Sequence, residues 1–498
     1  MSNWFEEMEA KIPRGGVRTR FAPSPTGYMH VGGLRTALYA YLIAKKSGGT
    51  FILRIEDTDQ ARFVEGATEI IIDTLNGVGL KYDEGPDIGG PAAPYTQSER
   101  RHLYLPYAEL LCEKGAAYYC FCETEAKQGD GSSAWMEHET DPCRDLPYAE
   151  SKRRVDEGAP FVVRMKAPRE GETTVEDMVF GLVTTQNKTL DDMVLLKRDG
   201  MPTYNFANVV DDHLMGITHV LRGSEYISSA PKYNLLYLAF GWEIPAYITV
   251  SPVMRDAQHK LSKRDGDPTY NDLLNQGCLP EAVLNYVALL GWSPGGEREV
   301  FSLEEMTEIF DVSGISKSPA IFDEEKLNYF NSEYIRALPP EKFAELAEPY
   351  IRKAVSNKAY SADQIARILQ ARCERLSDIP GKLDFFDNLP DYDNELYVHK
   401  KSKTDEAISL EMLRASRCAL EALEDWTTEA IHDTLIALAE SIGVKNATLM
   451  WPVRIAVTGK AVTPGGAVEV CRILGVDETI RRIDAGIRKL GVEGIADK

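Results

Sequence analysis

The chain has 498 residues, of which 44% are hydrophobic and 27% charged, and its formal net charge is −21. At roughly 100 to 200 residues per domain, this length predicts about three to five domains, and the composition excludes a chain that is disordered throughout. No apolar run reaches the ~18 residues that a membrane helix needs, and the first residues lack the pattern of a signal peptide. The sequence therefore predicts a cytoplasmic protein without membrane contact.

The acidic balance argues against an extensive nucleic-acid surface, because phosphate groups need basic side chains opposite them. Any RNA site must be local, and the candidate basic stretches, each also typical of a solvated face, are 152–154, 399–403 and 481–489. Eight cysteines without a secretion signal indicate free thiols or a metal site rather than disulfides.

Two kinds of pattern divide the chain. Over residues 17–90, short apolar strands such as 50–54 alternate with amphipathic helices such as 34–45, which is typical of a parallel α/β sheet. This pattern resumes near Val194, after a stretch at 118–160 that is rich in cysteine, glycine and charge and indicates an insertion.

Helical periodicity dominates the chain beyond about Asn331, and this half is predicted to be all α. The segments with the strongest period are 341–354, 362–376, 410–423 and 428–442.

The segment from Arg20 to Gly33 predicts a phosphate-binding site. A strand ends at two prolines, turns through Gly27 and leads into a helix whose first turn carries His30 and a glycine pair. A helix N-terminus offers free backbone N–H groups and the positive end of the dipole, and His30 adds another donor. The alternative is a capped helix with a surface histidine.

A second segment, from His259 to Gly266, carries Lys260 and Lys263 three residues apart. Such a basic loop can stabilise the charge that develops on a leaving pyrophosphate, and electrostatic stabilisation is the largest contribution in this kind of chemistry. A solvated basic loop is the usual interpretation of such a run taken alone.

In this order, the two segments resemble the signatures of class I aminoacyl-tRNA synthetases. His30-Val31-Gly32-Gly33 is similar to their HIGH motif, and Lys260-Leu261-Ser262-Lys263-Arg264 is similar to their KMSKS loop. Further runs resemble bacterial glutamyl-tRNA synthetases, namely 20–33, 54–59, 97–100, 202–213 and 318–323. The resemblance covers nearly the whole chain, although it is weaker in the helical half, where 454–459 and Pro464 still match.

This resemblance implies a multidomain α/β plus all-α architecture, with a Rossmann-type parallel sheet and a helical anticodon-binding half. The expected divisions are 1–95 and 204–266 for the two halves of the catalytic domain, 96–203 for an acceptor-stem-binding insertion, 267–336 for a stem-contact region, and 337–405 and 406–498 for two anticodon-binding subdomains.

The resemblance also implies a two-step reaction with ATP and Mg²⁺. The glutamate carboxylate attacks the α-phosphorus of ATP and releases diphosphate, after which the terminal ribose of tRNA(Glu) takes the glutamyl group. Positioning and charge neutralisation carry such catalysis, so no covalent enzyme intermediate is needed. The expected catalytic residues are His30, Lys260 and Lys263. The expected nucleotide contacts are Thr26, Gly27, His30, Gly32, Gly33, Glu225, Val253, Lys260, Leu261, Ser262, Lys263 and Arg264.

For glutamate itself, the resemblance implies that Arg20 and Arg222 face its carboxylates and that Glu56 holds its ammonium group. A guanidinium suits bidentate pairing with a carboxylate, while structural ion pairs are the alternative for these residues. The other expected pocket residues are Ala22, Ser24, Tyr204 and Asn208. The family often carries Trp where Tyr226 stands, a change that could retune the pocket.

The 118–160 stretch could bind zinc through Cys120, Cys122, His138 and Cys143, because three thiolates and an imidazole suit tetrahedral Zn²⁺. Some family members bind zinc here with a fourth ligand two residues after the last cysteine, where this chain has Asp145. Ordinary reduced thiols are the alternative. The remaining cysteines are expected in helices and in the core, and these are Cys112, Cys278, Cys373, Cys418 and Cys471.

In the helical half, Arg372 is a candidate for reading an anticodon base, because unstacked bases are recognised by hydrogen bonds and arginine stacking. A plain surface arginine is the alternative. The sequence leaves open whether tRNA(Gln) is also charged with glutamate, and a monomer is expected.

Other classes of protein fit less well. Glutaminyl-tRNA synthetases end in β-barrels, and a shortened glutamyl enzyme lacks the helical half altogether. A small-molecule nucleotidyltransferase needs no such extension, and the two intact phosphate motifs give no support to an inactive RNA-binding scaffold.

Overall fold

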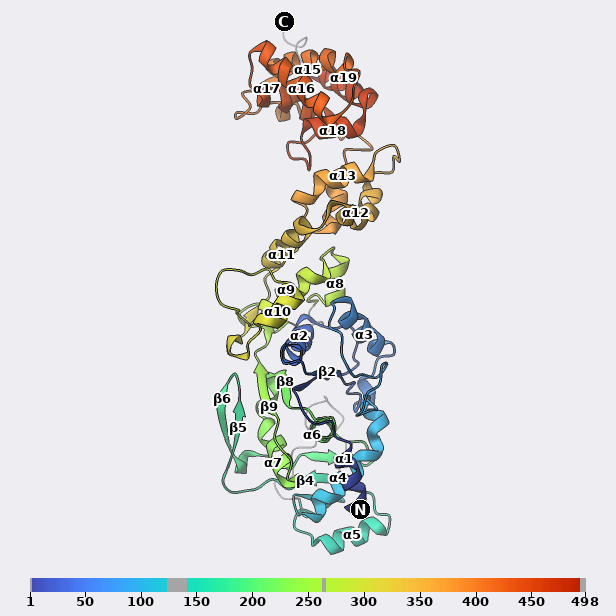
Figure 1. The fold of residues 1–498 in the computed structure, drawn as a ribbon, viewed down its shortest axis with the longest axis vertical. Helices are drawn as coiled ribbons and strands as arrows, with labels where there is room; N and C mark the ends of the chain where they lie inside the picture. Colours follow the sequence, from blue (N-terminus) through green and yellow to red (C-terminus); the bar gives the residue numbers. More distant parts are fainter. Residues whose placement is uncertain (1, 123–140, 262–265, 493–498) are drawn as a thin grey trace. The chain divides into compact units, whose positions relative to one another are not determined.

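The computed structural model describes residues 2–122, 141–261 and 266–492 (Figure 1). The chain divides into two compact units, the first containing 1–273 and 283–324, and the second containing 274–282 and 325–498. Among the described helices, none combines the length and the apolar character that crossing a membrane requires.

A six-stranded sheet forms the centre of the first unit, in the order β2-β1-β8-β9-β5-β6. Its strands are β1 (Arg18–Phe21), β2 (Thr50–Leu53), β5 (Glu172–Asp177), β6 (Gly181–Gln186), β8 (His219–Gly223) and β9 (Ala246–Val250). Neighbours from β2 to β5 run parallel, and only the edge strand β6 is antiparallel. The predicted parallel α/β sheet is confirmed.

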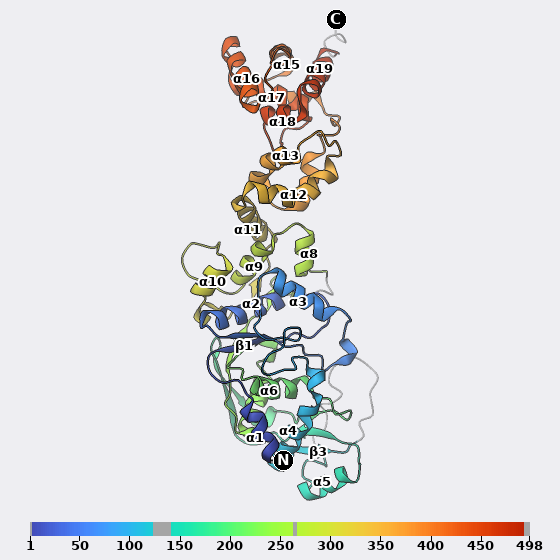
Figure 2. The same ribbon diagram turned by 45° about the vertical axis from the view of Figure 1, so that its right-hand side comes forward.

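Helices cover both faces of this sheet. Figures 1 and 2 show α2 (Val31–Lys46) on one face and α6 (Tyr204–Leu214) on the other. The apolar side of α6 is buried in a core with the strands, because Phe206 and Val210 pack in one cluster with Ile52 and Val220. The other helices assigned here are α1 (Ser2–Ala10), α3 (Ala67–Gly77), α4 (Arg101–Glu113), α5 (Tyr148–Asp156), α7 (Ala230–Phe240) and α10 (Leu303–Ile309).

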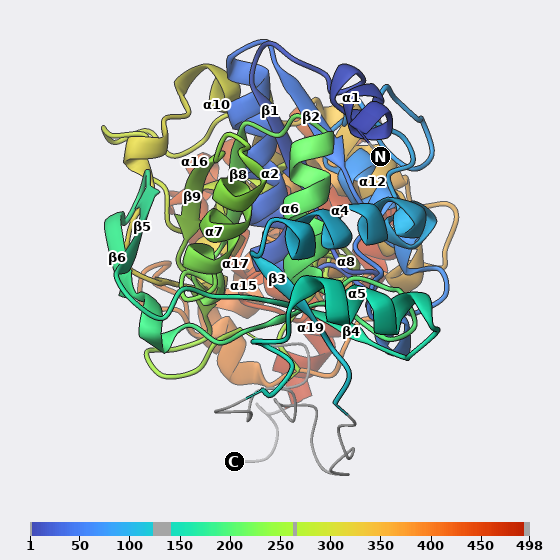
Figure 3. The same cartoon turned by 90° about the horizontal axis from the view of Figure 1, so that it is seen from below.

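A separate antiparallel sheet contains β3 (Ala117–Cys120), β4 (Val162–Met165) and β7 (Val194–Leu196). Figure 3 shows β3 and β4 beside α4 and α5. The expectation that the parallel pattern resumes near Val194 is therefore wrong, since that run pairs with β4. A short apolar run has the same sequence pattern in either kind of sheet, so periodicity could not distinguish them.

Two short helices and one pair of short strands remain to be described. Helices α8 (Tyr270–Asn275) and α9 (Pro280–Leu289) each cross from one unit to the other along the chain. In the first unit, β10 (Val253–Met254) pairs in parallel with β11 (Ala320–Ile321).

The second unit consists of helices joined by loops, and its described residues 325–492 contain no strand. Its helices are α11 (Glu324–Ala337, which begins one residue before the division), α12 (Pro340–Ala354), α13 (Ala362–Leu369), α14 (Ile379–Leu383), α15 (Glu406–Glu421), α16 (Thr428–Ile442), α17 (Asn446–Thr458), α18 (Ala467–Leu474) and α19 (Val476–Val492). Phe343, Ile351 and Leu435 belong to its single core cluster. The all-α prediction is confirmed.

Two details of that prediction are wrong. The helix expected over 362–376 ends at Leu369, because a 3-10 turn follows and Cys373 is extended (φ −92°, ψ 120°). Among the cysteines expected in helices and in the core, Cys418 lies on α15 but is exposed, and Cys278 and Cys373 are buried outside helices. One cysteine contributes little to a hydrophobic pattern. The pattern therefore cannot predict whether that cysteine lies in a helix or on its buried side.

Candidate active site

A cavity that is open to solvent lies at the carboxyl ends of the parallel strands in the first unit. The strand order reverses between β1 and β8, and this reversal is where ligands bind in open α/β sheets. Ten of the residues expected from the sequence line the cavity, namely Arg20, Ala22, His30, Gly32, Gly33, Tyr204, Arg222, Glu225, Val253 and Lys260.

His30 forms the N-cap of α2 and does not belong to the first helical turn. Its Nδ1 accepts a hydrogen bond from the backbone N–H of Gly33 at 3.0 Å. A Cβ atom at Gly32 would lie 3.2 Å from the imidazole ring, so glycine there keeps the ring and the backbone close together. The imidazole of His30 thus lies at the N-terminus of α2, which is the positive end of the helix dipole.

The described part of the second motif also reaches the cavity. Lys260 Nζ lies 3.7 Å from Glu225 Oε2, and the N–H of Leu261 donates to the carbonyl of Val253 at 3.0 Å. This backbone bond fixes the start of the motif beside β10. The next three expected contacts, Ser262, Lys263 and Arg264, lie outside the described residues.

Other expected residues do not line the cavity. Ser24 and Thr26 are exposed, and Gly27 between the prolines and His30 has φ +108°, a conformation that favours glycine. Leu261 contributes a backbone contact, and Glu56 and Asn208 are buried behind the lining residues.

Arg222 is a buried cation whose guanidinium lies over two aromatic rings. Its carbon Cζ is 4.8 Å from the ring centre of Tyr233 and 5.0 Å from that of Tyr247. Within the described chain, its Nε and Nη1 are buried and have no hydrogen-bond partner. Because a buried charge without a partner is costly, this arrangement suits an anionic ligand in the cavity.

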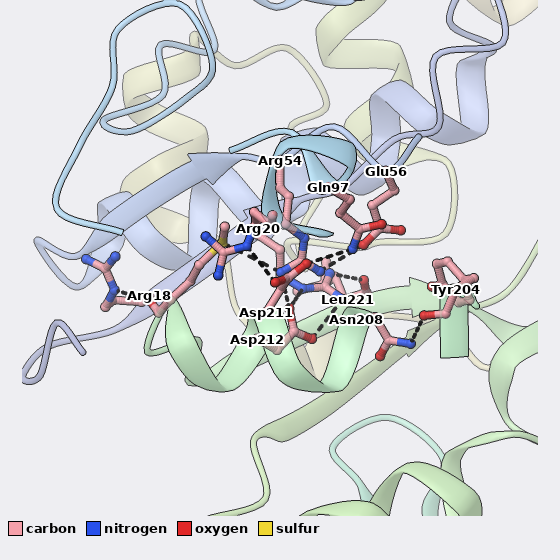
Figure 4. Close-up of polar contacts among 12 residues, drawn as sticks. Arg18, Arg20, Arg54, Glu56, Gln97, Tyr204, Asn208, Asp211, Asp212 and Leu221 are labelled. Atoms are coloured by element: carbon pink, nitrogen blue, oxygen red, sulfur yellow. Dashed lines mark hydrogen bonds and ion pairs between the residues drawn. The ribbon is translucent and has the colours of Figure 1, made fainter. Parts of the chain in front are cut away.

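The second expected carboxylate-binding residue, Arg20, belongs to a buried ion-pair cluster (Figure 4). Its Nε and Nη2 donate to the two carboxylate oxygens of Asp212 at 2.9 and 3.3 Å. Asp212 also accepts from Arg54 Nη1 at 2.7 Å, and Arg54 Nη2 donates to Glu56 Oε1 at 2.8 Å. The contacts therefore form a chain of alternating charge from Arg20 to Glu56.

Burial and charge shift the two carboxyl groups of this cluster in opposite directions. Burial raises the pKa of Glu56, although Arg54 and Arg20 oppose the shift. Burial would also raise the pKa of Asp212, but Arg20 and Arg54 outweigh it and hold that pKa below its usual range. Asp212 is thus a permanent buried anion at neutral pH, while Glu56 keeps its proton more readily.

Asn208 lies one turn along α6 from Tyr204 and donates through Nδ2 to the Tyr204 carbonyl at 2.8 Å. Its Oδ1 is buried without a partner among the described residues. The ring of Tyr204 packs against Tyr226, with centroids 5.3 Å apart, and both rings line the cavity. Tyr226 therefore supplies an aromatic wall of the cavity.

Sequence reasoning gave no role to several buried polar residues beside the cavity. Asp211 accepts from Arg100 Nε at 2.6 Å and from Gln97 and Tyr104, both at 2.9 Å. The signal in the sequence is the pair of adjacent acids that directly follows Val209 and Val210 in α6. Arg35 lines the cavity as well, and its guanidinium donates to backbone carbonyls instead of to an acid.

Three cysteines and one aspartate lie together in the first unit. The ligand atoms of Cys120, Cys122, Asp141 and Cys143 are all within 4.8 Å of one another. Cys122 Sγ lies 3.7 Å from both Cys143 Sγ and Asp141 Oδ1. His138, the expected imidazole ligand, lies outside the described residues, and sequence reasoning missed Asp141.

In the second unit, the anticodon candidate Arg372 is exposed on the 3-10 turn that follows α13. Its Nη1 donates to the carbonyl of Thr463 at 2.5 Å. The pKa of nearby Arg454 is lowered, first by burial and then by the charge of Arg372. Two cations therefore lie close together at this surface, which suits a polyanion.

Comparison with known proteins agrees with this geometry. Residues 16–329 match the family "tRNA synthetases class I (E and Q), catalytic domain", and residues 342–487 match "Anticodon binding domain". The chain is 55% identical to the glutamate–tRNA ligase of Clostridium botulinum strain Hall over 478 residues, which is 95% of this chain and 98% of that ligase. It is 54% identical to the glutamate–tRNA ligase of Clostridium kluyveri, over 96% and 99% of the two chains.

Solved structures give the same result. A glutamate tRNA ligase from Elizabethkingia meningosepticum, crystallised in complex with its amino acid, is 35% identical and superposes with a TM-score of 0.83, over 96% of this chain and all of that one. The glutamate–tRNA synthetase of Elizabethkingia anophelis gives 0.82, also at 35% identity, over 95% of this chain and 100% of that one. The match to the class I catalytic domain, the match to an anticodon-binding domain and the relatives that align over nearly the whole length agree, and the chain belongs to the glutamate–tRNA ligase family of class I aminoacyl-tRNA synthetases.

Proposed function

We propose that this chain activates L-glutamate with ATP and transfers it to the 3′ end of tRNA(Glu). The observation that carries the proposal is Arg222, which lines the open cavity and whose buried Nε and Nη1 have no hydrogen-bond partner in the described chain. A guanidinium held over two aromatic rings is rigid, and it can offer two donors to one carboxylate.

The charge around Asp212 supports glutamate as the amino acid. Three arginines, Arg20, Arg54 and Arg222, and two acids, Glu56 and Asp212, leave one positive charge in excess in this buried cluster. Glutamate has a net charge of −1 and would neutralise the cluster, whereas glutamine is neutral and would leave the charge uncompensated. Uncompensated buried charge is strongly unfavourable, so the cluster favours glutamate.

The nucleotide contacts proposed for ATP lie on the other side of the cavity. His30, Gly32 and Gly33 at the start of α2 suit phosphate oxygens, and Lys260 supplies a cation that leaving diphosphate would attract. Class I synthetases use ATP with Mg²⁺, which would neutralise part of the charge of the phosphate groups. Lys263 is proposed to act with Lys260 through the same charge complementarity.

RNA contacts are proposed for the segment 96–203, which would receive the acceptor stem, for 267–336 along the stem, and for 337–405 and 406–498 at the anticodon. Arg372, with its exposed guanidinium, is the proposed anticodon contact. The proposal also includes a monomer. It also places the reaction in the cytoplasm, where tRNA is charged for translation.

Zinc is proposed as a structural ion bound by Cys120, Cys122, Cys143 and Asp141. In a tetrahedron with Zn–S distances of about 2.3 Å, neighbouring sulfurs are about 3.8 Å apart. The 3.7 Å between Cys122 Sγ and Cys143 Sγ fits this spacing, and burial of Cys120 and Cys143 fits a closed structural site. Three thiolates and one carboxylate are all donors that Zn²⁺ accepts in proteins.

The proposal is tested by aminoacylation with radiolabelled glutamate or glutamine, ATP and Mg²⁺, with purified tRNA(Glu) and tRNA(Gln) in separate reactions. Charging of glutamate onto tRNA(Glu) is the expected result. Charging of glutamine, or of neither amino acid, would contradict the proposal. The reaction with glutamate and tRNA(Gln) decides whether the enzyme also charges that tRNA.

A further inference from the structure

We infer that Asp212 is a positioning residue for glutamate selection, which holds Arg20 and Arg54 so that Arg20 and Glu56 both stay available to the substrate. The inference rests on the proposed function and adds a residue that does not line the cavity. Asp212 lies in the last turn of α6, on its buried side, and has essentially no exposed surface.

The first step concerns the orientation of Arg20. A guanidinium has five N–H donors, and three of those of Arg20 are used, two by the oxygens of Asp212 and one by the carbonyl of Leu221 at 3.1 Å. This pairing fixes the plane of the guanidinium and leaves two donors. Arg20 lines the cavity, so Asp212 sets the direction in which those two donors can meet a carboxylate.

The second step concerns Glu56, which Asp212 does not touch. Arg54 is fully buried and connects the two acids, with Nη1 2.7 Å from Asp212 Oδ1 and Nη2 2.8 Å from Glu56 Oε1. Its rigid fork fixes the distance between them. The position of Glu56 therefore depends on Asp212 through one intermediate side chain, as Figure 4 shows.

The third step is the result of removing the charge of Asp212. Arg20 is close enough to Glu56 to lower its pKa, so the two groups attract one another. In a buried site this attraction is weakly screened, and without Asp212 the guanidinium would turn toward Glu56. The group proposed for a substrate carboxylate and the group proposed for the ammonium would then neutralise each other, and glutamate would have to break their pair to bind.

The chain contains a matched control in the neighbouring residue. Asp211 is equally buried on the same helix and pairs with Arg100, Gln97 and Tyr104. None of these partners lines the cavity. Asp211→Asn and Asp212→Asn each leave a buried arginine with less counter-charge, so both should lower thermal stability, but only the second should affect glutamate.

The experiment measures aminoacylation of tRNA(Glu) by the full chain, with glutamate and ATP varied separately. Asp212→Asn is expected to raise the KM for glutamate by about tenfold or more, because a charged hydrogen bond is worth about 1.5–3 kcal/mol. Its KM for ATP should stay within about twofold, and Asp211→Asn should leave the KM for glutamate within about twofold. A merely structural role would not separate the two substrates or the two variants.

A second variant keeps the test decisive if Asp212→Asn does not fold. Arg54→Lys keeps the positive charge but lacks the rigid planar fork that fixes the spacing of the two carboxylates, so it should raise the KM for glutamate without changing that for ATP. Equal effects of Asp212→Asn and Asp211→Asn, or an unchanged KM for glutamate in Arg54→Lys, would overturn the inference. If the wild-type chain charged no glutamate at all, the proposed function would fail first and the inference with it.

Discussion

His30 Nδ1 accepts a hydrogen bond from the backbone N–H of Gly33 at 3.0 Å, so the imidazole closes the N-terminus of α2. His30→Ala removes both this cap and a donor for phosphate. We expect stability to fall by about 1 kcal/mol. Adenylate formation should slow by about 100-fold, as when one transition-state donor is lost, while tRNA binding changes little. Diphosphate exchange in the presence of tRNA and a tRNA-binding titration measure the two effects.

A control for the capping role is His30→Asp. Aspartate is a good N-cap, so this variant should melt close to the wild type, but it places a negative charge beside the phosphates. Recovery of stability without recovery of adenylate formation would separate the two roles. A His30→Ala enzyme that lost tRNA binding as strongly as adenylate formation would contradict the role proposed for His30.

Contacts between residues close in the sequence could be predicted, whereas contacts between residues far apart in the sequence could not. His30 and Gly33 form a local device, and a motif of four residues is enough to locate it. Arg20 and Asp212 are 192 residues apart, and their pairing exists only because α6 packs on the sheet that contains β1. Patterning predicted the parallel sheet, but it could not predict which buried acid meets which arginine.

The cluster of three cysteines and Asp141 gives a second example. The sequence pattern predicted that Cys120, Cys122 and Cys143 lie together, whereas Asp141 is brought in by the backbone between it and Cys143. The Cys143 N–H donates to Asp141 Oδ1 at 2.9 Å. This local hydrogen bond holds the carboxylate beside the sulfurs. Aspartates are common in turns, and Asp141 and Asp145 both lie two residues from Cys143. Nothing in the sequence therefore distinguished one from the other as a neighbour of the sulfurs.

Arg222 should be the residue on which the glutamate requirement depends most strongly. Arg222→Ala is expected to raise the KM for glutamate by about 100-fold or more, since loss of one partner of a buried charge pair costs about 2–5 kcal/mol. Arg222→Lys keeps the charge but not the fork, and it should recover only part of the loss. Initial rates over a glutamate series measure both. An unchanged glutamate dependence would remove Arg222 from the pocket.

Glu56 should make glutamate binding sensitive to acid. Burial raises its pKa, so as the pH falls, Glu56 becomes neutral earlier than an ordinary carboxyl group and loses the ammonium of the substrate. The KM for glutamate should therefore rise toward low pH, while the KM for ATP does not. In Glu56→Gln the KM should be high at every pH and without this dependence. A wild-type KM that stays flat through the acid range would exclude Glu56 as the ammonium partner.

Arg372 should affect the RNA and not the amino acid. Arg372→Ala is expected to raise the KM for tRNA(Glu) by about tenfold, because a stacking or hydrogen-bonding contact to an unpaired base is worth about 1–3 kcal/mol. A nearby exposed arginine on α13, Arg367, pairs with Asp363 at 3.1 Å, and Arg367→Ala is the matched control. Equal values for both variants would make Arg372 a plain surface residue. The same preparations, tested with tRNA(Gln), show whether Arg372 contributes to discrimination.

The proposed zinc site predicts that substitutions of Asp141 and Asp145 have different effects on zinc binding, although both acids flank Cys143. Protein purified without chelators should contain about one zinc per chain, measured by plasma mass spectrometry. Asp141→Ala should lower the zinc content after dialysis and weaken affinity by about tenfold or more, and Cys143→Ser should do the same. The Asp145 side chain is 85% exposed and lies outside the cluster, so Asp145→Ala should retain the metal. If the wild type contained no zinc, the proposal would be wrong and the three cysteines would be reduced thiols. If Asp145→Ala lost zinc while Asp141→Ala kept it, the cysteines would bind zinc with a ligand other than Asp141.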